Sequence, residues 1–211
     1  MDRASMKTSS LLGMAVVLLA LVLPGHALVC KKCASVRSTS CTGRTTPCPY
    51  GSACTVSYAL IDGGDGPWPL YALSCGPKNK CGTKGSASMP GGGTVLMATS
   101  CCTTDNCIPD LPSLPVVSPA PNGLMCPSCV VSDADWCKPT KLMHCKGNEN
   151  MCILEATRVT GAISMSSAVR GCATPNICEL ERHQHYNNET VGDFRISCKK
   201  ASVSESTRQS M

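Results

Sequence analysis

The chain has 211 residues, of which 18 are cysteine, but it holds only 2 Trp, 4 Tyr and 1 Phe, so large aromatic rings cannot build its core. This cysteine content in a small protein is typical of a disulfide scaffold. The formal net charge of +5 is mild, and no run of basic residues is longer than two, which argues against nucleic-acid binding.

Residues 1–27 have the pattern of a secretory signal peptide. Arg3 and Lys7 precede an unbroken apolar run from Leu11 to Leu23, and small residues follow where cleavage would occur. The run is shorter than the ~20 residues that span a bilayer, so a retained transmembrane helix is the less favoured interpretation. The segment after Lys200 is polar, without the hydrophobic tail of a lipid-anchor signal. We therefore expect a secreted, extracellular protein without stable membrane insertion.

Residues 28–107 form the first predicted domain, in which the intervals between cysteines have the patterns of hairpins. The interval 55–74 contains two strand-like runs on either side of the turn-rich segment 62–67, and 82–100 predicts a second hairpin with a glycine-rich tip. A shorter loop at 34–40 supplies a third excursion. The pattern predicts three loops that project from a cysteine-rich base.

Residues 108–122 contain five prolines and predict a linker. Proline-rich segments favour extended geometry, so we expect a semi-rigid spacer between two domains. The apolar side chains of Leu111, Leu114, Val116 and Val117 could dock on one of the domains.

Residues 123–211, the second predicted domain with a polar C-terminal tail, repeat the cysteine framework of the first. Eight successive cysteines of the first domain match eight of the second at separations of 96 to 98 residues. Cys102 and Cys107 have no cysteine counterparts, because they align with Lys199 and Ser204. Their joint absence from the second copy implies that Cys102 and Cys107 bond each other. Both copies have even cysteine counts and can close their bridges internally, although spacing alone leaves many pairings open.

The opening Cys30-x-x-Cys33 and the closing run from Cys101 to Cys107 resemble the three-finger domains of the lymphocyte-antigen/urokinase-receptor (LU) superfamily. Two such domains in one secreted chain resemble the gamma-type phospholipase A2 inhibitor family. The likeness is strongest in the second domain, in segments 122–129, 146–152 and 170–174, and it departs at Ile108, where many three-finger domains place Asn. It implies an all-β, disulfide-rich fold of two tandem three-finger (snake-toxin-like) domains and assembly into homo- or hetero-oligomers.

The resemblance also implies the disulfide pairing. In the first domain the pairs are Cys30 with Cys54, Cys33 with Cys41, Cys48 with Cys75, Cys81 with Cys101, and Cys102 with Cys107. In the second they are Cys126 with Cys152, Cys129 with Cys137, Cys145 with Cys172, and Cys178 with Cys198. Each bridge contributes ~2–4 kcal/mol, which would compensate for the missing aromatic core.

Other uses of the cysteines and histidines are less favoured. The Cys-x-x-Cys pairs at 30/33 and 126/129 could belong to zinc or redox sites, but a secreted chain favours disulfides. His183 and His185 lie on one side of a predicted strand without an evident third metal ligand. We expect no metal site and no cofactor.

Catalytic motifs are missing from the sequence. There is no Gly-x-Ser-x-Gly elbow, His-Glu-x-x-His pair or phosphate loop. The run from Cys101 to Cys107 superficially resembles the catalytic helix of secreted phospholipases, but it lacks the histidine that would activate water. We therefore predict no catalytic residues and a protein that is not an enzyme.

Binding is then expected at the fingertips, because loops on a rigid scaffold carry recognition. Pro67, Trp68 and Pro69 crown the long finger of the first domain, and Trp is enriched in interface hot spots. Alternatively, Trp68 folds back against Tyr71. Trp136 is expected to pack on the neighbouring disulfide.

The single Asn-x-Ser/Thr sequon, at Asn188, predicts a glycan on the last hairpin. A glycan there would shield that finger, so we expect binding by the first domain or by the opposite face. Two functions fit: inhibition of a secreted phospholipase A2 by occlusion, as the resemblance implies, and modulation of a cell-surface receptor or adhesion partner. The fold alone does not separate them.

Overall fold

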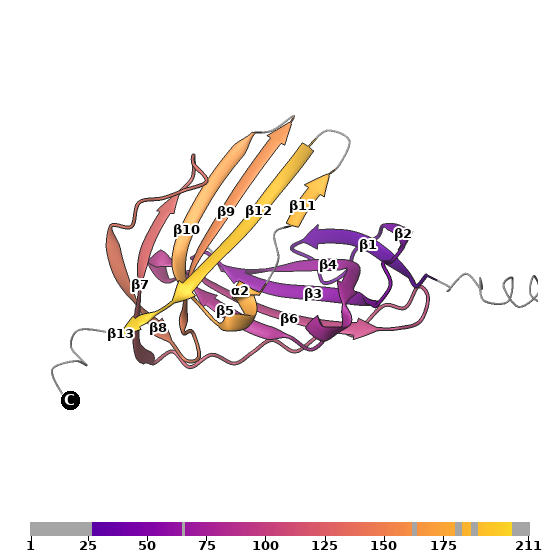
Figure 1. Ribbon diagram of the computed structural model, residues 1–211, viewed down its shortest axis with the longest axis horizontal. Coiled ribbons are helices and arrows are strands. Elements are labelled where there is room, and N and C mark those ends of the chain that lie inside the picture. Colours follow the sequence, from indigo (N-terminus) through magenta and orange to yellow (C-terminus); the bar gives the residue numbers. More distant parts are fainter. Residues whose placement is uncertain (1–26, 65, 162–163, 180–182, 187–189, 204–211) are drawn as a thin grey trace, which may run out of the picture.

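Antiparallel hairpins make up almost all of the computed structural model (Figure 1), which describes residues 27–64, 66–161, 164–179, 183–186 and 190–203. The expected signal peptide, except Ala27, and the sequon at Asn188 lie outside the described residues. Within the described part of the chain, no helix is long and apolar enough to cross a membrane.

The first domain consists of three hairpins arranged side by side. The first finger is β1 (Val29–Val36) and β2 (Arg44–Pro47), the second is β3 (Ser52–Asp62) and β4 (Pro67–Pro77), and the third is β5 (Lys84–Ser88) and β6 (Thr94–Cys102). A 3₁₀ turn at Lys78–Lys80 connects the second finger to the third, and another at Pro90–Gly92 connects the two strands of the third finger. The strand order β5-β6-β3-β4-β1-β2 places the second finger between the other two.

The second domain repeats this arrangement. Its fingers are β7 (Pro121–Val131) with β8 (Lys141–Lys146), β9 (Met151–Gly161) with β10 (Met165–Ala173), and β11 (His183–Tyr186) with β12 (Thr190–Lys200). A short helix α2 (Pro175–Cys178) precedes the third finger, and a final strand β13 (Ser202–Val203) pairs with β7. The expectation of an all-β protein with two three-finger domains is confirmed.

Nine disulfides join the same partners that the resemblance implies. They are Cys30–Cys54, Cys33–Cys41, Cys48–Cys75, Cys81–Cys101, Cys102–Cys107, Cys126–Cys152, Cys129–Cys137, Cys145–Cys172 and Cys178–Cys198. Buried cystine sulfurs form one core cluster at the base of each domain, so the cysteines take the place that aromatic rings occupy in other small cores.

The two domains are not held apart by the linker, contrary to the sequence-based expectation. Strand β5 of the first domain pairs with β10 of the second, so one continuous sheet crosses the domain boundary. Small side chains permit this approach: a Cβ atom added to Gly171 would lie 2.1 Å from the carbonyl oxygen of Ser88. A shared apolar cluster lies beneath the junction and contains Ala59, Ala87 and Met97 from the first domain and Ile153, Ala173 and Ile177 from the second.

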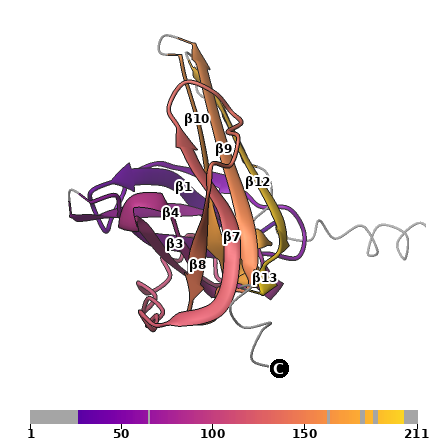
Figure 2. The same cartoon turned by 90° about the vertical axis from the view of Figure 1, so that its left-hand side faces the viewer.

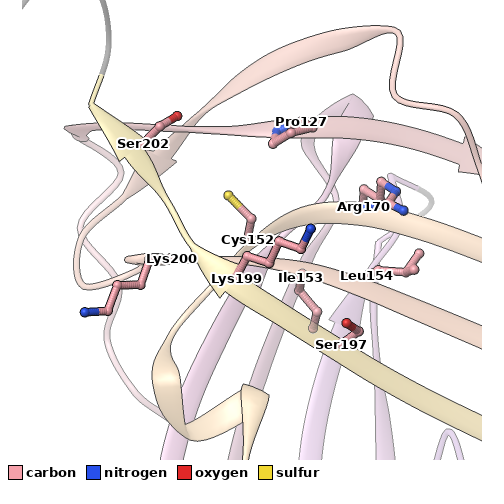
Figure 3. A pocket seen from close by; sticks show the side chains of 9 residues that line it. All are labelled: Pro127, Cys152, Ile153, Leu154, Arg170, Ser197, Lys199, Lys200 and Ser202. Atoms are coloured by element: carbon pink, nitrogen blue, oxygen red, sulfur yellow. The ribbon is translucent and has the colours of Figure 1, made fainter.

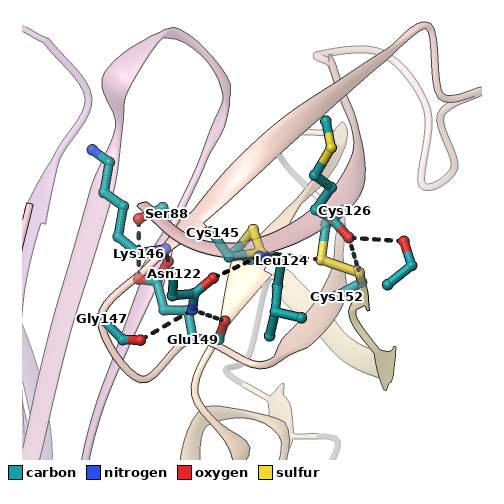
Figure 4. The surroundings of a disulfide bond; sticks show 12 residues. Ser88, Asn122, Leu124, Cys126, Cys145, Lys146, Gly147, Glu149 and Cys152 are labelled. Carbon is teal, nitrogen blue, oxygen red and sulfur yellow. Dashed lines mark hydrogen bonds between the residues drawn. A yellow bond between two sulfur atoms is a disulfide. The ribbon is translucent and has the colours of Figure 1, made fainter. Parts of the chain in front are cut away.

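A buried carboxyl group lies in this junction. Glu149 is 1% exposed and accepts hydrogen bonds from the hydroxyls of Ser86 (3.1 Å) and Ser88 (3.0 Å), both in the first domain. Burial raises the pKa of Glu149, and these hydrogen bonds oppose the rise in its pKa. The Asn122 side chain holds the same loop, because its amide donates to the carbonyl oxygens of Gly147 and Glu149 (Figure 4).

The linker follows the first domain instead of bridging open space. The Ser100 hydroxyl donates to the Asp110 carbonyl oxygen, and the Lys84 ammonium donates to the Ser113 hydroxyl at 2.7 Å. Of the apolar side chains expected to dock, Leu114 and Val117 are half-buried, whereas Leu111 and Val116 are exposed. In both views the upper parts of β9, β10 and β12 project away from the first domain (Figure 1, Figure 2).

Candidate functional site

The two domains differ in the side chains on one face of the second finger. In the first domain this face is filled: Val56, Tyr71 and Leu73 form a buried cluster against the Cys33–Cys41 bridge, with Tyr58 packed on it. By cysteine register, Tyr58, Tyr71 and Leu73 correspond to Ala156, Ala168 and Arg170 in the second domain. The second domain has alanines in place of the two tyrosines and an arginine in place of the leucine, so it has less side-chain volume and an added charge here.

A groove of about 430 Å³ lies beside this face. It is lined by Pro127, Cys152, Ile153, Leu154, Arg170, Ser197, Lys199, Lys200 and Ser202 (Figure 3). The Lys199 side chain is directed toward the part of the groove where Arg170 lies, whereas Lys200 points away. None of these described lining residues is acidic, so the groove favours an anionic group.

Lys199 occupies the register position that Cys102 has in the first domain, because Cys102 lies opposite Cys54 and Lys199 opposite Cys152. The first domain closes this corner with the Cys102–Cys107 bridge and with Asp105, whose carboxylate accepts from the amide N–H of Val29. The second domain closes it with β13, whose two residues pair with β7. The second domain therefore has a lysine at the edge of the groove where the first domain has a disulfide-bonded cysteine.

A second hollow of about 250 Å³ continues the groove toward the first finger. Its lining residues are Asp135, Trp136, Leu154, Ala156, Arg195 and Ser197, and it shares Leu154 and Ser197 with the larger hollow. The Asp135 carboxylate pairs with Arg158 at 2.9 Å and Arg195 at 2.6 Å. These ion pairs hold the first-finger loop over the strands. They also mean that the Asp135 carboxylate in this hollow is already paired with cations.

Trp136 was expected to pack on the neighbouring disulfide, and the structure places an arginine over its ring. Its side chain is 55% exposed, and the guanidinium of Arg170 lies 5.8 Å from its ring centroid. The Nε–H of Arg170 also donates to the carbonyl oxygen of Cys137 at 3.2 Å, which fixes the stack. Tryptophan and arginine are among the residue types most enriched in interface hot spots.

The residues of the predicted fingertip site lie together at the start of β4 but differ in exposure. Pro67 is exposed, and Trp68 and Pro69 are half-buried. Tyr71 is only 5% exposed and belongs to the core of the first domain, so its assignment as a binding residue was wrong. Leu70, on the same strand, packs against the cluster shared by the domains. Part of this finger therefore stabilises the domain junction.

The cysteine groups that come together are structural. The sulfurs of Cys30, Cys48 and Cys75 lie close enough to suggest a metal site, and so do those of Cys126, Cys145 and Cys172, but every one of them is in a disulfide. The side chains of His183 and His185 lie outside the described part of the chain.

Comparison with known proteins identifies the domains. The u-PAR/Ly-6 domain matches residues 26–110 and 122–207. The chain is 31% identical over 135 residues to the phospholipase A2 inhibitor NAI of Notechis ater, covering 61% of this chain and 66% of that protein. It is 29% identical over 134 residues to a gamma-type phospholipase A2 inhibitor of Elaphe climacophora, covering 62% of this chain and 66% of that protein.

A urokinase plasminogen activator surface receptor, from Bos taurus, is 40% identical over 85 residues, covering 37% of this chain and 24% of the receptor. The matched part of the chain spans 66% of the length of the two phospholipase A2 inhibitors. These relatives are named as inhibitors and receptors, in agreement with the expectation of binding without catalysis. With both of its halves matched, the chain belongs to the u-PAR/Ly-6 domain family, as a protein that carries two of these domains in tandem.

Proposed function

We propose that this protein is an extracellular inhibitor of secreted phospholipase A2 that binds the enzyme and occludes it. The observation that carries the proposal is the similarity to named phospholipase A2 inhibitors across 61% of the chain. The groove and the hollow that adjoins it add a physical basis, because the exposed tryptophan of the hollow and the arginine and lysine of the groove are suited to hold a protein partner.

An inhibition assay tests this proposal. The purified protein, with its disulfides intact, is titrated against a panel of secreted phospholipases A2 acting on a substrate kept monomeric. Inhibition should rise with protein concentration and saturate at a fixed stoichiometry. Because a monomeric substrate offers no lipid surface, such inhibition excludes coating of the substrate as its cause. No inhibition of any enzyme at micromolar protein would refute the proposal.

The alternative function is modulation of a cell-surface receptor or adhesion partner. The 40% identity to a urokinase receptor over 85 residues favours this alternative. Binding to cell-surface proteins together with a negative phospholipase panel would select it.

We also propose that residues 1–27 direct secretion, that Asn188 carries a glycan, and that the protein assembles into oligomers. Secretion from cultured cells should yield a product that begins near Leu28 by N-terminal sequencing. Enzymatic deglycosylation should lower its mass, and an Asn188→Gln variant should not respond. Light scattering on the eluting protein should give a mass above that of one chain.

A further inference from the structure

We propose that the groove of the second domain binds an acidic segment of the partner protein, with a carboxylate between Arg170 and Lys199 and an apolar side chain in the hollow beside Trp136. This inference deepens the proposed function, on which the choice of a protein partner rests. It assigns the contact surface to the second domain and not to the fingertip of the first.

The charges of the groove carry the first step. Lys199 is exposed and directed toward Arg170, and neither forms an ion pair within the described part of the chain. The nearby carboxylate of Asp135 is already engaged by Arg158 and Arg195. Two cations that converge on one space repel each other, and an anion placed between them removes that repulsion.

The shape of the groove carries the second step. The hollow of about 250 Å³ is lined by Leu154, Ala156 and the half-exposed Trp136. In the first domain, Tyr58 occupies the register position that Ala156 has in the second. Its side chain packs on the buried cluster of that domain. An apolar or aromatic side chain from a partner would restore in the second domain the packing that Tyr58 supplies in the first.

The repeat also suggests the variants for a test. Ala156→Tyr fills the hollow with the residue that the first copy holds at this position. Lys199→Glu reverses an exposed charge and leaves the packing intact, so it remains informative if the filled variant does not fold. Lys78→Glu, at an exposed lysine of the first domain, is the matched charge control.

The probe is a random twelve-residue peptide library displayed on phage and selected on the wild-type protein, which needs no phospholipase. We expect the selected peptides to be acidic with a large apolar residue, and to bind Lys199→Glu and Ala156→Tyr about tenfold more weakly or worse, while Lys78→Glu binds normally. Selection of no acidic binders, or of binders with equal affinity for both groove variants, would overturn the inference.

Two further outcomes separate this inference from the proposed function. If the groove peptides are found but no phospholipase is inhibited, the groove stands and the enzyme target is wrong. If a phospholipase is inhibited equally by wild type and Lys199→Glu, the function stands and the groove assignment is wrong. Binding of heparin fragments at Lys199, with no peptide binding, would replace the protein segment by an anionic glycan and refute the proposal.

Discussion

Glu149 contacts both domains, and its ionisation makes the stability of the protein depend on pH. Its carboxyl group accepts hydrogen bonds from two serine hydroxyls of the other domain, and burial raises its pKa above the ordinary value of 4.5. A raised pKa in the folded state means that folding favours the protonated form. The stabilising contribution of this group is therefore complete below the pKa of the unfolded chain and is lost as the pH rises through the folded-state pKa.

We predict that the free energy of unfolding of the wild type falls, relative to that of Glu149→Gln, as the pH rises above 4.5. Chemical unfolding at a series of pH values measures this difference. Glu155, whose pKa is also raised by burial, is present in both proteins and cancels in the comparison. An identical pH dependence in the two proteins would contradict the account of Glu149.

The close approach of β10 to β5 leaves no room for a side chain at residue 171. We predict that Gly171→Ala lowers the free energy of unfolding by about 1–3 kcal/mol, because the new Cβ would clash with the backbone of Ser88. It should also speed hydrogen exchange of the β5 amides. Gly63→Ala is the control, since nothing lies within 4 Å of its added Cβ. Equal effects of the two substitutions would count against the close approach of the strands.

The disulfide that only the first domain has should be the least costly to remove. Its partners, Cys102 and Cys107, are 5 residues apart, whereas Cys48 and Cys75 are 27 apart. Chain-entropy estimates give about 2 kcal/mol for the short loop and about 3.5 kcal/mol for the long one. This order is tested by replacing each pair by serines and measuring the free energy of unfolding with a chemical denaturant. A larger decrease for the Cys102–Cys107 pair than for the Cys48–Cys75 pair would contradict the prediction.

The cysteine spacing predicted the hairpins, their repeat and the Cys102–Cys107 bridge, because each is local or periodic in sequence. It could not predict the pairing of β5 with β10. Residues 85–88 are Gly, Ser, Ala and Ser, all small, so their burial depends on a strand about 85 residues later. The groove was missed for a similar reason: Ala156 and Arg170 carry no signal alone, and only comparison with Tyr58 and Leu73 through the repeat would have marked them.

At the scale of the molecule, all nine disulfides lie within a domain, so the junction and the linker alone hold the halves together. A protease site inserted after Val116, which is fully exposed, would sever the linker. We predict that the cleaved protein still elutes as one species in size-exclusion chromatography without denaturant, because the shared sheet and apolar cluster remain. Separation of the halves under these conditions would show that the linker, and not the junction, joins them.

The central claim is that the second-domain groove holds a secreted phospholipase A2. The most direct measurement is the affinity of an enzyme from the panel for wild type, Lys199→Glu and the control Lys78→Glu, with free thiols assayed to verify intact disulfides. The account predicts saturable binding that weakens about tenfold or more in Lys199→Glu and is unchanged in the control. Equal affinity of all three proteins, or no binding to any enzyme, would contradict it.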